Sequence, residues 1–143
     1  AEYPDIVEGV RHLRRINSQL RRVRALDDGE LMAEAKQLGA PVQLLRLVRE
    51  QGKLPVPNFA AGGISTPADA ALVMQLGAEA VFVGSGIFKS EDPARFARAI
   101  VKATARYPYP ADVLAASRGL GAPMRGRSVD SLEDGERLAG RGW

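Results

Sequence analysis

Apolar residues recur near helical spacing through the first third of the chain. Over residues 6–26 the apolar positions form one stripe and arginines occupy the other face, which predicts one long helix. Asp27 and Glu30 then form an Asp-x-x-Glu pair of the kind that caps a helix start, so a second helix is predicted over 29–38. A third helix is predicted over 41–51. Three successive helices without a strand resemble an insertion of the kind that often makes oligomer contacts.

Two short apolar runs, each followed by glycine, change the pattern in the middle of the chain. Residues 58–61 and 80–83 are predicted to be strands, and the second is continuously apolar, as a buried parallel strand is. Between them, Thr66 is a good N-cap for a tightly packing helix. Glycines 62 and 63 follow the first run and Gly84 follows the second, and each cluster leads towards a helix start.

The rest of the chain is predicted to be helical and then irregular. A helix is expected from about residue 92 to 106 and a shorter one over 111–118. From residue 121 onwards the sequence is rich in Gly, Arg, Ser and acids. Such a composition buries little apolar surface, so we divide the chain into a folded part, 1–121, and a flexible tail, 122–143, that is mobile unless it docks elsewhere.

The paired glycine clusters are the strongest chemical signal. Glycine lets the backbone approach an anion closely, and in (β/α)8 barrels a phosphate site is often built from the loops after strands 7 and 8. Two glycine-ended strands about one βα unit apart fit that arrangement. Each cluster could also be a tight turn with no ligand. A shared phosphate site explains both clusters at once, and it favours an α/β fold that is part of a barrel.

Composition limits these readings. The chain has 143 residues, 45% of them hydrophobic and 26% charged, which is typical of one globular domain. A closed barrel typically needs about 250 residues, so only a piece of one is expected. No apolar run approaches the ~18 residues of a membrane span and no signal peptide is evident, which favours a cytoplasmic protein without membrane contact. Without cysteine and with His12 as the lone histidine, no thiolate or histidine-rich metal site is expected.

The net charge of +3 is mild, but much of the basic charge is local. We interpret the arginine face of the first predicted helix as a solvated or subunit-facing surface, with an anion or nucleic-acid patch as the alternative. No aromatic residues are interleaved for base stacking, so nucleic acid is not expected as a partner. The arginines concerned are Arg11, Arg14, Arg15, Arg21, Arg22 and Arg24.

Several long runs resemble one enzyme family. They are Glu-Ala-Lys-Gln-Leu-Gly-Ala-Pro at 34–41, Asn-Phe-Ala-Ala-Gly-Gly-Ile-Ser-Thr-Pro at 58–67 and Val-Phe-Val-Gly-Ser-Gly-Ile-Phe-Lys-Ser at 81–90. They strongly resemble the synthase (lyase) subunit of glutamine-dependent pyridoxal 5'-phosphate synthase, and the likeness extends over nearly the whole chain. That family is a (β/α)8 barrel of about twice this length. The chain therefore looks like its C-terminal part, with strands 7 and 8 and inserted helices after strand 6.

The resemblance implies an activity and a set of site residues. Members of the family make pyridoxal 5'-phosphate from ribose 5-phosphate, glyceraldehyde 3-phosphate and ammonia, which a glutaminase subunit supplies. Pyridoxal 5'-phosphate is then the product and no cofactor is expected; a homo-oligomer, a hexamer or dodecamer, is implied. By resemblance Gly63, Gly84 and Ser85 bind the pentose phosphate, Arg14 contacts the triose phosphate, and Lys36 reaches the second, product-holding site of a neighbouring subunit.

The chain also departs from the family. The two imine-forming lysines would lie upstream of Ala1, and neither Lys53 nor Lys89 matches their positions. No catalytic residue is therefore assigned, and this chain alone is expected to be inactive. The alternative is a catalytically inactive truncated paralogue that acts as an assembly or phosphate-binding module. A more distant alternative is a different phosphate-binding barrel or a basic nucleic-acid binder.

Overall fold

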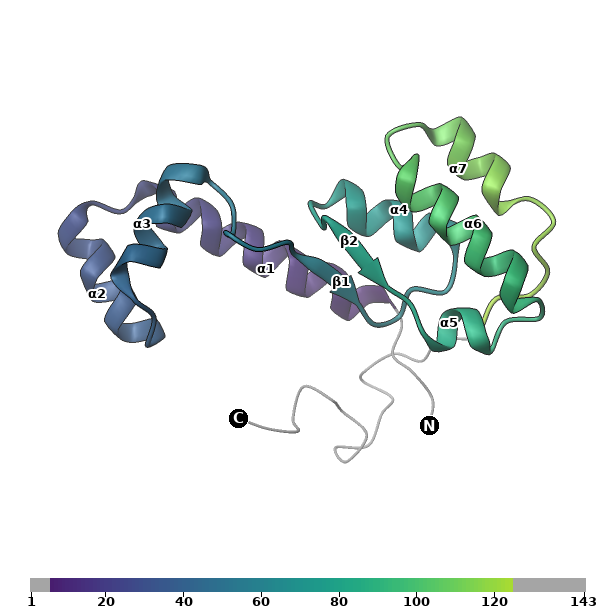
Figure 1. The fold of residues 1–143 in the computed structure, drawn as a ribbon, viewed down its shortest axis with the longest axis horizontal. Helices are drawn as coiled ribbons and strands as arrows, with labels where there is room; N and C mark the ends of the chain where they lie inside the picture. The colour runs from purple at the N-terminus through teal and green to yellow at the C-terminus, as the bar shows by residue number, and fades with distance from the viewer. Residues whose placement is uncertain (1–5, 125–143) are drawn as a thin grey trace, which may run out of the picture. The chain divides into compact units, whose positions relative to one another are not determined.

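The computed structural model of this protein describes residues 6–124. The fold is α/β and mostly helical, with a small parallel sheet (Figure 1). None of the helices in the described range is long and apolar enough to cross a membrane. In chain order the elements are α1 (Ile6–Ala25), α2 (Asp28–Leu38), α3 (Val42–Gln51), β1 (Phe59–Ala61), α4 (Pro67–Gln75), β2 (Ala80–Phe82), α5 (Ser85–Phe88), α6 (Pro93–Ala105) and α7 (Pro110–Ser117).

The chain divides into two compact units. Residues 14–58 form one, which we call the helical unit, and the described residues 6–13 and 59–124 belong to the other, the sheet unit. Helix α1 contributes residues to both. The sequence predicted a single folded part, residues 1–121, with the inserted helices inside it.

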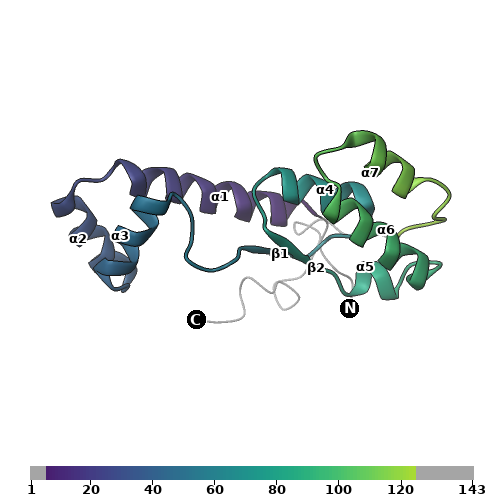
Figure 2. The same ribbon diagram turned by 45° about the horizontal axis from the view of Figure 1, so that its top comes forward.

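The helical unit consists of the second part of α1 with α2 and α3, which are seen together in Figure 2. The capping box predicted at α2 is present. The Glu30 N–H donates to Asp27 Oδ1 at 2.8 Å, and the Asp27 N–H donates to Glu30 Oε2 at 2.9 Å. The predicted bounds of all three helices are confirmed to within one or two residues. The buried side chains of this unit are Val23, Leu31, Ala35, Leu45 and Val48.

An ion pair ties α3 to the start of α2. Arg49 Nη2 lies 2.7 Å from Asp28 Oδ1, and Arg49 Nη1 donates to the Leu26 carbonyl at 3.2 Å. The hydrogen bond and the charge of the Arg49 guanidinium lower the pKa of the Asp28 carboxyl. The charged form of Asp28 is therefore favoured by folding.

The arginine face of α1 is exposed, as predicted. Arg14, Arg15, Arg21 and Arg24 all occupy exposed positions. Arg22 is likewise exposed, and its Nη2 lies 2.7 Å from Glu34 Oε2 on α2. One of these cations thus helps to join two helices of the unit.

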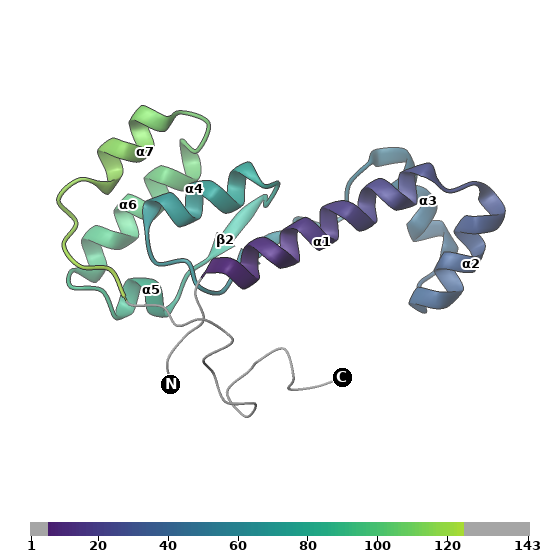
Figure 3. The same ribbon diagram turned by 180° about the vertical axis from the view of Figure 1, so that it is seen from behind.

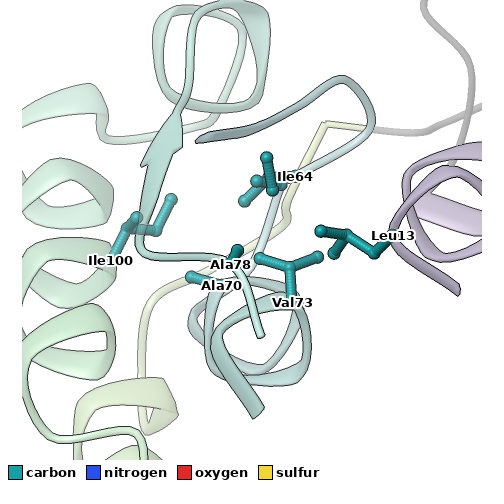
Figure 4. Packing of buried hydrophobic residues seen from close by; sticks show 7 residues of the cluster. Leu13, Ile64, Ala70, Val73, Ala78 and Ile100 are labelled. Carbon is teal, nitrogen blue, oxygen red and sulfur yellow. The ribbon is translucent and has the colours of Figure 1, made fainter. Parts of the chain in front are cut away.

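The sheet unit is built on β1 and β2, which pair in parallel with Phe59 opposite Ala80 and Ala61 opposite Phe82. Both predicted strands and their parallel pairing are confirmed. Helices α4, α6 and α7 pack on one another, and α4 also packs on β2 (Figures 1 and 3). In Figure 4 the labelled core side chains point towards a common centre between these elements. The buried core consists of Leu13, Ala60, Ile64, Ala70, Val73, Ala78 and Ile100.

The opposite face of this sheet is open, which corrects one prediction. Residues 80–83 were expected to form a buried strand, yet Phe82 is 62% exposed and Ala80 and Val81 are only half-buried. Phe59 is 44% exposed and stacks on Phe82, with ring centroids 4.6 Å apart and planes 16° apart. A continuously apolar strand indicates cover on both faces. In the described residues the helices cover only the face that carries Ala60.

The predicted tail, 122–143, lies almost wholly outside the described residues. Its first residue, Ala122, contacts the rest of the sheet unit, because the Ala122 N–H donates to Glu91 Oε2 at 2.9 Å. Leu120, just before it, is buried with Phe96 and Ala99 of α6. The folded part therefore extends at least to this contact.

Candidate functional site: two glycine turns at one sheet edge

The two glycine turns lie at the same edge of the sheet. Since β1 and β2 are parallel and in register, their carboxyl ends, Ala61 and Phe82, are opposite each other. Gly62 and Gly63 follow directly after β1, and only Val83 lies between the end of β2 and Gly84. The structure thus brings together the predicted residues Gly63, Gly84 and Ser85. In open α/β sheets this edge, beyond the carboxyl ends of the strands, is where ligands bind.

Backbone conformation requires glycine in the first turn. Gly62 has φ +97° and Gly63 has φ +75°, a left-handed conformation that L side chains rarely adopt. Gly84 differs, because its φ is −115°. A Cβ added at Gly84 would meet no atom within 4 Å. Packing within the described chain therefore gives no reason for glycine at position 84, whereas an approaching ligand would give one.

Gly86 is required for a different reason, which is contact between the two turns. It is buried, and a Cβ there would lie 2.0 Å from the Ile64 carbonyl oxygen and 2.9 Å from Ser65 Cα. The obstacles are backbone atoms, which cannot rotate away as a side chain can. Gly86 therefore lets the turn after β1 lie directly against the turn after β2.

Ser85 begins α5 at the second turn. The first hydrogen bonds of this short helix are donated by Ile87 and Phe88 to the Gly84 carbonyl, at 2.9 and 3.0 Å. The N–H groups of Ser85 and Gly86 precede these bonds, so they have no partner within the helix. Ser85 itself is half-buried. Backbone donors of this kind are what a phosphate oxygen accepts from.

Asp69 holds the first turn from the start of α4. Its Oδ2 accepts from the Ser65 N–H at 3.0 Å, the Ser65 hydroxyl at 3.2 Å and the Thr66 N–H at 2.9 Å. In return the Asp69 N–H donates to Thr66 Oγ1 at 3.1 Å. The predicted N-cap at Thr66 is confirmed, and the carboxylate extends it into a clamp on the residues that follow the glycines.

Comparisons with known proteins bear on the same residues. The SOR/SNZ family matches residues 1–61, and the family of thiazole biosynthesis protein ThiG matches residues 33–119. Over 139 residues the chain is 56% identical to pyridoxal 5'-phosphate synthase subunit PdxS of Niallia circulans, 55% to that of Halalkalibacterium halodurans and 57% to that of Actinobacillus pleuropneumoniae. Each alignment covers 97% of this chain and 47% of the relative.

The SOR/SNZ match by itself covers only residues 1–61. The chain is similar to PdxS along nearly its whole length, including the strands and the glycine turns. The family resemblance stated from the sequence is thereby confirmed. The chain spans about half the length of the PdxS relatives it matches, 47% in each case.

The remaining two residues that the SOR/SNZ resemblance singled out lie in the helical unit. Arg14 is on α1 and Lys36 is in the last turn of α2, and both are exposed. Exposure leaves both cations accessible to a ligand or to a neighbouring subunit. Their assigned roles rest on the family resemblance.

The sequence did not show the role of two residues at the site. Gly86 was grouped with Gly84 and Ser85 in the second glycine cluster, but its close approach to Ile64 joins segments that are far apart in sequence and was not predicted. Asp69 was visible as an acidic residue in the first turn of a helix. The capping-box spacing from Thr66 to Asp69 was the signal that could have identified the clamp.

Proposed function

We propose that this chain serves the biosynthesis of pyridoxal 5'-phosphate (vitamin B6), and that it supplies the phosphate-binding half of a (β/α)8 barrel. The observation that carries this proposal is the 55–57% identity to PdxS over 97% of the chain. On this proposal the complete protein is a lyase-type synthase that joins ribose 5-phosphate, glyceraldehyde 3-phosphate and ammonia.

The open face of the sheet supports the barrel part of the proposal. In a (β/α)8 barrel the helices form an outer ring, and side chains of the strands fill the interior. Here the helices cover the Ala60 face, and Phe59 and Phe82 stack on the uncovered one. Two strands cannot close a barrel. We infer that this aromatic pair belongs to a barrel interior, with β1 and β2 as strands 7 and 8.

The proposed site residues have distinct roles. Gly63, Gly84 and Ser85 cradle the phosphate of ribose 5-phosphate through backbone N–H groups, for which the open space at Gly84 leaves room. Arg14 holds the phosphate of glyceraldehyde 3-phosphate, since a guanidinium offers a forked pair of donors. Lys36 serves a second phosphate position in a neighbouring subunit of a homo-oligomer.

The covalent chemistry is proposed to lie outside these residues. The imine-forming lysines that the resemblance implies have no counterpart at Lys53 or Lys89. The chain alone is therefore proposed to bind phosphate groups without forming product. Ammonia would come from a separate glutaminase subunit.

Complementation tests this proposal. The chain is co-expressed with the part of Niallia circulans PdxS that it does not match, and the purified complex is titrated with ribose 5-phosphate by calorimetry. We expect a complex that binds ribose 5-phosphate and, given glyceraldehyde 3-phosphate and ammonium, forms pyridoxal 5'-phosphate, whereas either part alone forms none. Failure of the two parts to associate, or a complex that does not bind ribose 5-phosphate, would contradict the proposal.

A further inference from the structure

The Asp69 carboxylate stands at the start of a chain of contacts that reaches both glycine turns. One oxygen, Oδ2, accepts three hydrogen bonds from Ser65 and Thr66, at 2.9 to 3.2 Å. A cap of a helix start alone would require only the bond between the Asp69 N–H and Thr66 Oγ1 and the return bond to Thr66. The two additional bonds to Ser65 extend the clamp towards Gly63 and the end of β1.

Ile64 carries the constraint further. It precedes Ser65, its side chain is 3% exposed in the core of the sheet unit, and its carbonyl oxygen lies against Gly86. Gly86 is in α5, directly after Gly84 and Ser85. A displacement of Ser65 and Ile64 therefore changes the surface on which the second turn rests.

We propose that Asp69 is a positioning residue for phosphate binding, which fixes the turn after β1 and, through the contact between Ile64 and Gly86, its spacing from the turn after β2. The inference rests on the proposed function, because it assumes that the two turns share one phosphate group. Asp69 touches neither substrate nor product in this role. It acts by ordering the backbone donors before the ligand arrives, so that binding does not have to order them.

The sign of the charge separates this role from simple electrostatics. Asp69 is an acidic residue beside a proposed anion site, so removing its charge should by itself favour a phosphate. A positioning role predicts the opposite, since a loosened turn must be ordered again on binding. Weaker phosphate binding by a variant that lacks this negative charge would therefore reflect lost order.

Two variants at this position and one matched control make the test. Asp69→Ala removes all the side-chain bonds, whereas Asp69→Asn keeps one oxygen that can accept them and removes only the charge. Asp27→Ala is the control, because Asp27 and Glu30 form the same kind of capping box in the helical unit, whereas Asp69 belongs to the sheet unit. Each variant is prepared as the complex with the complementing part of Niallia circulans PdxS and titrated with ribose 5-phosphate. Amide hydrogen exchange of residues 62–66 is measured without ligand.

We expect Asp69→Ala to raise the Kd for ribose 5-phosphate about tenfold, the effect of reordering roughly one residue, and to speed exchange across 62–66. Asp69→Asn should stay within about threefold of wild type, and Asp27→Ala should change neither quantity. Wild-type affinity in Asp69→Ala, with wild type itself binding, would overturn the positioning role and leave the proposed function standing. Equal weakening in Asp27→Ala would also overturn it, by tracing the loss to general destabilisation. A wild-type complex that does not bind ribose 5-phosphate would overturn both proposals.

Discussion

A methyl group at position 86 should force the two glycine turns apart. In Gly86→Ala the new Cβ would lie 2.0 Å from the Ile64 carbonyl oxygen, 2.9 Å from Ser65 Cα and 3.0 Å from the Ile64 carbonyl carbon. Non-bonded heavy atoms prefer separations of about 3.5–4.0 Å. The backbone segments must therefore separate by roughly 1 Å or more, and Ile64 must move with them although it is 3% exposed in the core.

The size of the effect follows from the rigidity of these neighbours. Overpacking a well-packed site typically costs about 1–3 kcal/mol, and backbone obstacles place this substitution at the upper end, near ~3 kcal/mol. For a complex of roughly 300 residues, such a loss of stability lowers the Tm by roughly 5–10 °C. Thermal unfolding of the complemented complex, followed by circular dichroism, measures it directly.

Gly84→Ala is the matched control. Its added Cβ would meet no atom within 4 Å, so the Tm should change little although the methyl group intrudes on the proposed phosphate position. Gly86→Ala should thus lower the Tm, whereas Gly84→Ala should lower the affinity for phosphate without lowering the Tm. An unchanged Tm in Gly86→Ala, or an equal fall in Gly84→Ala, would refute the argument that close approach of the two turns explains Gly86.

Four further predictions concern Gly84, Arg14, the open sheet face and the Asp28 ion pair. In the complex, Gly84→Val should abolish ribose 5-phosphate binding at all salt concentrations, since its effect is steric. Wild-type binding by Gly84→Val would remove the basis for the site. Arg14→Ala should weaken glyceraldehyde 3-phosphate binding by about one to two decades, which is the loss of one charge-assisted hydrogen bond. The loss should be smaller at high salt, because charges are screened over about 10 Å at 0.1 M. The isolated chain should not behave as a stable monomer, because no element within residues 6–124 covers the aromatic sheet face or the outer strand edges. A monodisperse monomer with a sharp two-state melt would contradict this. Finally, Asp28→Asn should destabilise the helical unit at neutral pH. Because Arg49 lowers the pKa of Asp28, that contribution is present above the ordinary pKa of about 3.9 and is lost as the pH falls through the lowered value, so the difference from wild type should vanish in acid; a pH-independent difference would argue against the pair.

Helix starts and stops were predictable because their causes are local. The capping boxes at Asp27 and Thr66 involve residues three positions apart, and the predicted helices agree with the observed ones to within one or two residues. The glycine turns were predictable too, since each follows an apolar strand directly. Parallel pairing followed from the continuous apolar run before Gly84, although the burial inferred from that run was wrong for Phe82.

The remaining features depend on contacts between distant segments. Stacking of Phe59 on Phe82 follows from the register of the two strands, which no local pattern specifies. The same holds for Gly86 against Ile64, where the reason for glycine lies in another turn. Burial of a strand depends on what covers each of its faces. A continuous apolar run does not reveal whether this chain covers one face of the strand or both.

The core of the sheet unit also implies an order of folding. Segment β1–α4–β2 is continuous in sequence and brings together Ala60, Val73 and Ala78 through short loops, whereas Leu13 joins the same core from before α2 and α3. Contacts that close short loops form faster than those that close long ones. The β1–α4–β2 segment should therefore acquire protection first, with Leu13 docking later onto a core that already exists. Until then the side of this core that Leu13 covers would be open, so early folding intermediates should expose more apolar surface than the folded unit does.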